Sequence, residues 1–253
     1  GWEPPQYAHI PLIHGADGQK LSKRHGATSV QEYRKDGFLP EALRNYLLRL
    51  GWSHGDDEII TSAQAIEWFD LGGVGRSPAR FDLAKLESLN AHYLREAPAE
   101  ELVSMLAEIL AKDTGEAISD SVRVRLNAAL PHLTPRAKTL LELANGAQFL
   151  VSAPVYPLNE PKAAKLLDNA GVEVLAQMVP VLEALEDWSV DALEKAMRRK
   201  GEELGLGFGK IAQPLRVALT GSTASPGIFD VMVILGREES LSRLRAVPSA
   251  RRE

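Results

Sequence analysis

Apolar residues recur at helical spacing through most of this sequence, and this periodicity constrains the fold more than any other feature. Leu43, Tyr46, Leu47 and Leu50, for example, lie three or four residues apart, so they would share and bury one face of an α-helix. No strong alternation with a period of two appears after residue 30. We therefore expect a mainly α fold, and the lack of a fixed-period repeat argues against a solenoid.

Capping and turn residues divide this region into separate helices. Ser29 can cap a helix in which Glu32 completes a capping box, and Pro40 suits the first turn of the next one. The Pro-rich stretch 152–159 predicts a linker, and the tail 248–253 is expected to be disordered. We expect helices over residues 29–35, 40–50, 62–69, 82–96, 99–112, 119–130, 135–151, 161–170, 172–186, 190–204, 209–219, 227–235 and 238–246.

The first 26 residues have a different pattern. Residues 7–13 are apolar and strand-like, and residues 15–18 contain two glycines and an aspartate, which favour a tight turn. A short return strand is expected over residues 20–24. The sequence therefore predicts a short N-terminal β-hairpin that leads into a loop.

Composition limits the classes of function. The chain of 253 residues has a net charge of −5, which argues against broad nonspecific binding of nucleic acid but allows a confined basic face. It contains no cysteine, so disulfides and thiolate metal sites are excluded and a reducing, cytoplasmic location is expected. The histidines show no i, i+4 pairing, so we expect no zinc. No apolar run is long enough for a membrane helix.

One short motif carries chemistry. Lys20-Leu21-Ser22-Lys23-Arg24 follows a hydrophobic segment and a turn, and it is similar to the KMSKS loop of class I aminoacyl-tRNA synthetases. The KLSKR form is typical of the glutamyl enzymes. Further stretches also resemble the bacterial glutamyl-tRNA synthetases, and together they span nearly the whole chain: 29–34, 39–47, 50–55, 85–90 and 213–221.

This resemblance implies an ATP-dependent attachment of glutamate to tRNA(Glu) through glutamyl-adenylate, with Mg²⁺ as the metal. Lys23 is expected to bind the ATP phosphates, with Lys20 as a second cation, and Leu21, Ser22 and Arg24 complete the motif. Lysines on a mobile loop can meet the negative charge that develops on the phosphates, and one such donor is worth about 3–4 kcal/mol in a transition state. The alternative is a surface turn whose lysines serve solubility.

The residues that would bind glutamate and adenine have no match here. The family's HIGH motif and its Rossmann-type core are not found, and His9-Ile10-Pro11-Leu12 is only superficially similar, so His9 is interpreted as structural. The chain begins with Gly1, and its earliest methionine is Met105. We therefore expect a piece of a longer enzyme, with L-glutamate bound by an N-terminal part and no ATP–pyrophosphate exchange by this chain alone.

The resemblance also implies a domain organisation: residues 1–26 would end the catalytic domain, 27–97 would form the stem-contact domain, and 98–253 a helical anticodon-binding domain split near 152–160. Proteins usually read RNA sequence from unpaired bases that stack on aromatic or arginine side chains. Arg136 and Arg216 are the candidates for tRNA binding, and the alternative for each is a local salt bridge.

Three functional hypotheses remain open at this stage. The first is part of a glutamate–tRNA ligase that acts as a monomer. The second is a stand-alone helical module that binds tRNA or protein without catalysis, although such a module would not need the KLSKR motif. The third is a glutamyl enzyme that also charges tRNA(Gln), which the sequence does not distinguish from the first.

Overall fold

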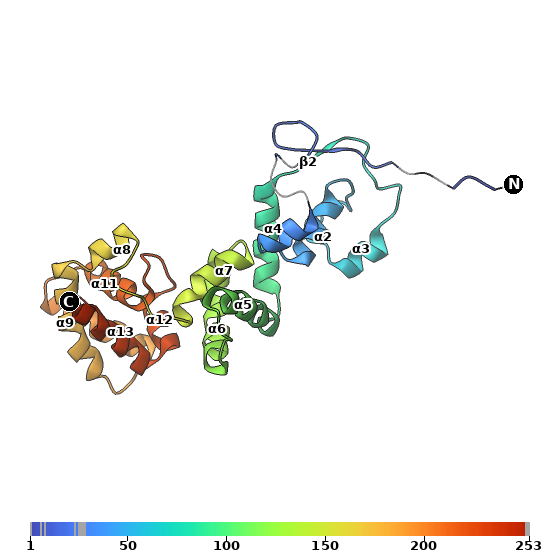
Figure 1. Cartoon of the computed structure of the whole chain (residues 1–253). Coiled ribbons are helices and arrows are strands. Elements are labelled where there is room, and N and C mark those ends of the chain that lie inside the picture. Colours follow the sequence, from blue (N-terminus) through green and yellow to red (C-terminus); the bar gives the residue numbers. More distant parts are fainter. Residues whose placement is uncertain (1, 6, 8, 23, 25–28, 251–253) are drawn as a thin grey trace. The chain divides into compact units, whose positions relative to one another are not determined.

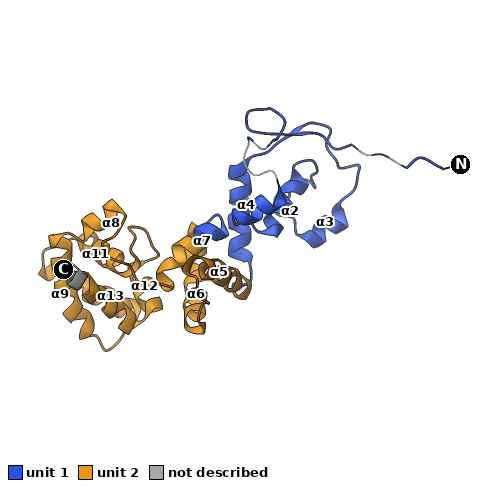
Figure 2. Cartoon of the chain, viewed as in Figure 1, with its two compact units in different colours: residues 1–98, 137–143 blue, residues 99–136, 144–253 orange. Residues whose placement is uncertain are grey.

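The computed structural model describes residues 2–5, 7, 9–22, 24 and 29–250, with side chains up to Val247 (Figure 1). The chain divides into two compact units, coloured separately in Figure 2. Unit 1 comprises Gly1–Pro98 together with Ala137–Leu143, and unit 2 comprises Ala99–Arg136 together with Ala144–Glu253. Both are built mainly from helices, as the periodicity predicted.

Unit 1 is a small helical core that carries two short strands. Its helices are α1 (Val30–Lys35), α2 (Pro40–Arg49), α3 (Ser62–Trp68) and α4 (Leu83–Glu96). Helices α2 and α4 pack together (Figure 1) around a buried cluster formed by Tyr33, Phe38, Leu43, Tyr46 and Leu86. The burial of these large side chains supplies most of the driving force for the unit to fold.

Local capping explains where the helices of unit 1 begin. The predicted box at α1 is confirmed: Ser29 Oγ accepts a hydrogen bond from Glu32 N (3.3 Å), and Glu32 Oε2 accepts one from Ser29 N (3.0 Å). Thr61 forms an equivalent box at α3. The Asp82 carboxylate accepts from Lys85 N (3.2 Å) at α4. Each cap satisfies backbone N–H groups that have no partner within the helix.

The strands are shorter than predicted. Residues 7 and 9–12 have no regular structure, and only Ile13–His14 form a strand, β1. The return strand is reduced to one antiparallel bridge between His14 and Lys20. The main partner of β1 is β2 (Ala79–Arg80), which pairs with it in parallel. An extended segment becomes a strand only where a neighbour pairs with its backbone, and the sequence pattern did not identify that neighbour.

Unit 2 is entirely helical in its described residues. Its elements are α5 (Ala99–Thr114), α6 (Asp120–Leu133), η2 (Thr134–Arg136), the end of α7 (Leu140–Ala147), η3 (Gln148–Leu150), α8 (Pro161–Leu166), α9 (Asn169–Glu183), α10 (Val190–Glu203), α11 (Phe208–Thr220), α12 (Ile228–Leu235) and α13 (Arg237–Ala250). Helices α9, α11 and α13 pack against one another. They bury Met178, Leu215 and Leu244 completely.

Two helix predictions need correction, while the others are confirmed to within about one helical turn. The single helix expected over residues 135–151 is broken into η2, α7 and η3. A new helix starts there because Thr139 Oγ1 accepts from Glu142 N (3.2 Å) and the Glu142 carboxylate accepts from Lys138 N (2.7 Å). The tail prediction is wrong for residues 248–250, which continue α13; residues 251–253 lie outside the described part.

Candidate nucleotide and RNA sites

The KLSKR motif follows a closed turn formed by residues Gly15–Gln19, here called the KLSKR turn. Gly15 N donates to Gln19 O (2.8 Å), and Gly18 N donates to Gly15 O (3.0 Å). Gly18 has a φ of +76°, a conformation that glycine adopts without a Cβ penalty. Leu21 N then donates to Ile13 O (2.9 Å), so the backbone of the motif's second residue is fastened to β1.

The described side chains of the motif are distributed around this turn. Lys20 and Arg24 are exposed, while Leu21 and Ser22 are half-buried. Arg24 lies 4.0 Å from the Asp17 carboxylate, an exposed ion pair of small energetic value. Lys23 lies outside the described residues. The two exposed cations are therefore accessible to an anion, and the predicted role of Lys23 stays a prediction.

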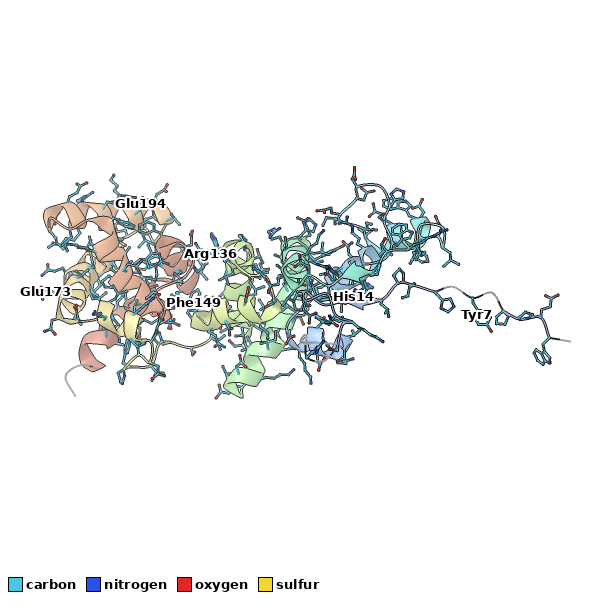
Figure 3. All side chains as sticks on the ribbon, turned by 90° about the horizontal axis from the view of Figure 1, so that it is seen from above. Tyr7, His14, Arg136, Phe149, Glu173 and Glu194 are labelled. Carbon is cyan, nitrogen blue, oxygen red and sulfur yellow. The ribbon has the colours of Figure 1, made fainter. Side chains whose placement is uncertain are left out.

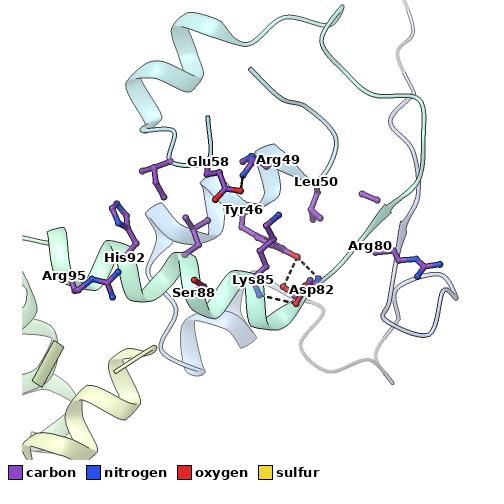
Figure 4. A pocket seen from close by; sticks show the side chains of 13 residues that line it. Tyr46, Arg49, Leu50, Glu58, Arg80, Asp82, Lys85, Ser88, His92 and Arg95 are labelled. Carbon is purple, nitrogen blue, oxygen red and sulfur yellow. Dashed lines mark hydrogen bonds and ion pairs between the residues drawn. The ribbon is translucent and has the colours of Figure 1, made fainter. Parts of the chain in front are cut away.

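A cavity of about 510 Å³ lies along α4 in the same unit (Figure 4), and we call it the α4 cavity. Lys85, Ser88, His92 and Arg95 follow one another along the helix at its edge (Figure 4), because their spacing places them on one helical face. Tyr46, Arg49, Leu50, Glu58, Ile59, Ala79, Arg80, Asp82 and Leu89 complete the lining.

The α4 cavity has an excess of positive charge. Arg49 is neutralised by Glu58 at 3.2 Å, and Asp82 is occupied as the helix cap. Lys85, His92 and Arg95 form no ion pair with any residue that the structure describes. Unpaired cations along one face of a helix suit a run of phosphates. The signal that sequence reasoning missed was this basic spacing within the predicted helix 82–96.

The structure brings the two predicted tRNA-binding arginines together in unit 2. Arg136 ends η2 (Figure 3), and Arg216 lies on α11. Arg136 Nη1 donates to Ser225 O (2.7 Å), and Arg216 Nη1 donates to the same oxygen (3.2 Å) and to Pro226 O (2.7 Å). Arg216 also bonds to the Ser225 hydroxyl. Both arginines therefore hold the loop between α11 and α12.

The two arginines differ in what remains available to a ligand. Arg216 is half-buried, and burial, followed by the charge of the nearby Arg136, lowers the pKa of its guanidinium. Its bonds go to carbonyl and hydroxyl oxygens and not to a carboxylate, so the salt-bridge alternative is wrong for Arg216 in the printed contacts. Arg136 is exposed and has one printed bond. Arg136 is thus the more accessible cation, and Arg216 shapes the loop beside it.

Metal and membrane sites give little to build on. In the described part of the chain, no group of three or more His, Asp or Glu side chains could hold a metal ion. The expectation of no zinc stays a prediction, since a few residues are not described. None of the described helices has the length and apolar content of a membrane span.

Comparisons with known proteins agree with this arrangement of sites. Residues 99–248 match the anticodon binding domain family, and residues 1–88 match the catalytic domain family of class I tRNA synthetases (E and Q). A glutamate–tRNA ligase 2 of Rhizorhabdus wittichii is 57% identical over 245 residues, which cover 96% of this chain and 52% of the relative. A glutamate–tRNA ligase 1 of Brucella melitensis is 53% identical, with the same coverage of both chains.

Solved structures give the same result at lower identity. A glutamate tRNA ligase from Elizabethkingia meningosepticum, crystallised with its amino acid, superposes with a TM-score of 0.80 and 28% identity. The match covers 98% of this chain and 52% of that one. The chain spans about half the length of the relatives it matches, and the class I family implies the use of ATP. This chain therefore belongs to the glutamyl-tRNA synthetase family, within which it carries the KLSKR motif and the anticodon binding domain.

Proposed function

We propose that this chain is the part of a glutamate–tRNA ligase that carries the ATP loop and binds tRNA. The observation that carries the proposal is the presence of the KLSKR turn and the cationic α4 cavity in one compact unit. The complete ligase would join glutamate to tRNA(Glu) through glutamyl-adenylate. A stand-alone binding module would have no use for the KLSKR motif, so this alternative is less well supported.

The proposed chemistry is attack of the glutamate carboxylate on the α-phosphate of ATP, with pyrophosphate as the leaving group. Lys20 and Lys23 would stabilise the charge that grows on the phosphate oxygens. Ser22 would add a hydroxyl or a backbone contact, and Arg24 and Leu21 would complete the loop. Mg²⁺ would accompany ATP, while glutamate would bind to residues outside this chain. We further propose a cytoplasmic monomer.

The α4 cavity is the proposed contact for a double-helical arm of the tRNA. Lys85 and Arg95 are exposed and His92 is half-buried, so a phosphate backbone could lie along this face of α4. Contacts of this kind position an RNA without reading its sequence. The cavity thus supplies affinity and register, and base specificity must come from another part of the chain.

We propose that the anticodon is read at the loop held by Arg136 and Arg216. Unpaired bases are commonly recognised by hydrogen bonds and by stacking on guanidinium planes. Arg136 would contact a base directly, whereas Arg216 would hold Ser225 and Pro226 in position. Whether tRNA(Gln) is also charged depends on this loop. Arg136→Ala is expected to change the preference between tRNA(Glu) and tRNA(Gln), measured as a ratio of kcat/KM values.

A chimaera tests the function as a whole. The chain would be fused behind the N-terminal half of the Rhizorhabdus wittichii relative and assayed for glutamate charging of tRNA(Glu). Charging is expected in the chimaera and not in the chain alone. Lys20→Ala/Lys23→Ala should abolish glutamate activation while leaving tRNA binding intact. A folded chimaera that binds tRNA but forms no glutamyl-adenylate, with either ATP concentration or time extended, would favour the binding-module alternative.

A further inference from the structure

The four residues Ala79–Asp82 connect the KLSKR turn to the helical core of unit 1. We infer that this segment, here called the strap, fixes the position of the KLSKR turn, and that Arg80 is its positioning residue. The strap lies more than fifty residues beyond the motif in the sequence, and nothing in the KLSKR pattern itself points to it. Its two ends make different contacts, and each end supports the inference.

The first end of the strap pairs with the strand that leads into the turn. Ala79 lies opposite Ile13 and Arg80 lies opposite His14 in the parallel β1–β2 pair. Phe81 N donates to His14 O at 2.7 Å. The turn is otherwise closed only by its own short-range bonds and by the bridge between His14 and Lys20. The strap is therefore the non-local support of the turn among the described residues.

The Arg80 side chain extends this support beyond the backbone. Its Nη2 lies 3.7 Å from the position that a Cβ on Gly18 would occupy, so the guanidinium covers the turn, as Figure 4 shows. Residues paired across neighbouring strands place their side chains on the same face. Lys20, His14 and Arg80 thus form a row of basic side chains. Arg80 consequently acts both on the shape of the turn and on the positive field around Lys20.

The second end of the strap is anchored in the core. The Phe81 ring lies 5.7 Å from that of Tyr33 and 5.1 Å, edge-on, from that of Tyr46. The Tyr46 hydroxyl accepts from Asp82 N (2.6 Å) and donates to Asp82 O (3.0 Å). Asp82 in turn caps α4, the helix that bears the cations of the α4 cavity. One short segment therefore contacts the turn, the core and the start of α4.

Hydrogen exchange tests the strap on the chain as it is. Arg80→Ala is expected to speed exchange of the amides of Gly15, Gly18 and Leu21 by roughly threefold to tenfold, because these amides donate within the turn and local opening sets their exchange rates. The matched control is Arg76→Ala, which removes an exposed arginine four residues earlier. Equal exchange in the Arg80→Ala variant and the control would overturn the inference.

Two further variants separate positioning from general destabilisation. Arg80→Lys keeps a long cationic side chain and should recover at least half of the lost protection on a logarithmic scale. Tyr46→Phe keeps the ring but removes both hydroxyl bonds to Asp82, so it should accelerate exchange in the turn more than in α2, its own helix. Acceleration spread evenly over unit 1 would mean that the strap has no specific role. Arg80 is exposed, so its substitution still tests the inference if Tyr46→Phe unfolds the chain.

An activity measurement in the chimaera extends the test, and it rests on the proposed ligase function. Arg80→Ala is expected to raise the KM for ATP in pyrophosphate exchange by roughly threefold to tenfold, with a smaller effect on kcat, while Arg76→Ala leaves both unchanged. An unchanged KM together with altered exchange would remove Arg80 from ATP positioning. If the unsubstituted chimaera shows no pyrophosphate exchange, the proposed function fails, whereas the hydrogen-exchange result on the turn is unaffected.

Discussion

At the scale of single residues, Asn90 joins two segments of unit 1 that lie far from it in the sequence. Its side chain is fully buried; Oδ1 accepts from Leu39 N (2.8 Å), and Nδ2 donates to Lys138 O (2.5 Å). Asn90→Ala is expected to cost about 2–4 kcal/mol in unfolding free energy, because it leaves two buried backbone groups without partners. Urea denaturation measures this loss. Asn127→Ala, at an exposed position of α6, serves as control, and equal losses would refute the argument.

Tyr156 predicts a pH dependence in unit 2. Its hydroxyl donates to Ala218 O (3.2 Å), and burial raises its pKa to about 12. The folded state therefore holds this proton more tightly than the unfolded state, in which a tyrosine titrates near pH 10. The stability from this group is fully present below about pH 10 and is lost as the pH rises toward 12.

Tyr156→Phe isolates this effect from the other tyrosines. At pH 8 the substitution should lower the unfolding free energy by about 1 kcal/mol, since the bond to Ala218 O is lost. The difference from the unsubstituted chain should shrink as the pH is raised from 9 to 11, when the unsubstituted chain loses the advantage of its neutral phenol. Urea unfolding at several pH values measures the difference. A constant difference over this range would contradict the assignment.

At the scale of secondary-structure elements, the start of α7 provides a local test. Thr139 caps the helix through Glu142 N, and the Glu142 carboxylate accepts from Lys138 N. Thr139→Ala should cost about 1 kcal/mol, as is typical for loss of a cap, whereas Thr139→Ser should cost little because the hydroxyl is retained. Denaturant midpoints of the two variants measure the difference. Equal midpoints would mean that the cap contributes nothing.

The same helix start shows what the sequence could and could not predict. Helices such as α2 and α4 follow from periodicity and end signals that are close together in the chain. The break before α7 was also readable, because Thr139 and Glu142 have the spacing of a capping box, but the continuous apolar pattern masked it. The partner of β1 was not readable, since pairing with Ala79–Arg80 depends on the folded core and not on any local pattern.

The candidate sites divide along the same line. The KLSKR motif is visible as a run of letters, so its cations could be named in advance. Arg136 and Arg216 could each be proposed from resemblance, but their convergence on Ser225 joins elements that are distant in the sequence. The basic face of α4 lies between these cases. Its spacing was present in the sequence, yet only the cavity showed that those cations lack acidic partners nearby.

At the scale of the whole molecule, the net charge of −5 means that any RNA must be held at confined cationic patches. The α4 cavity belongs to unit 1, and the arginine-held loop belongs to unit 2. When one ligand engages two linked sites, the second contact becomes intramolecular and the overall affinity exceeds that of either site. Two modest patches are therefore sufficient for an acidic chain to bind a large RNA.

This division predicts how binding depends on salt and on the length of the RNA. A complete tRNA(Glu) should be weakened by Lys85→Ala, by Arg95→Ala and by Arg136→Ala, and each lost phosphate contact at α4 should reduce the log–log salt slope by about 0.7–0.9. An isolated anticodon stem-loop should respond to Arg136→Ala alone, because it would not occupy the α4 cavity. Fluorescence anisotropy at several salt concentrations measures both RNAs, with Arg76→Ala as control. If Lys85→Ala weakens the stem-loop as much as the complete tRNA, the α4 cavity does not bind a separate arm, and the charge of α4 acts only as a general field.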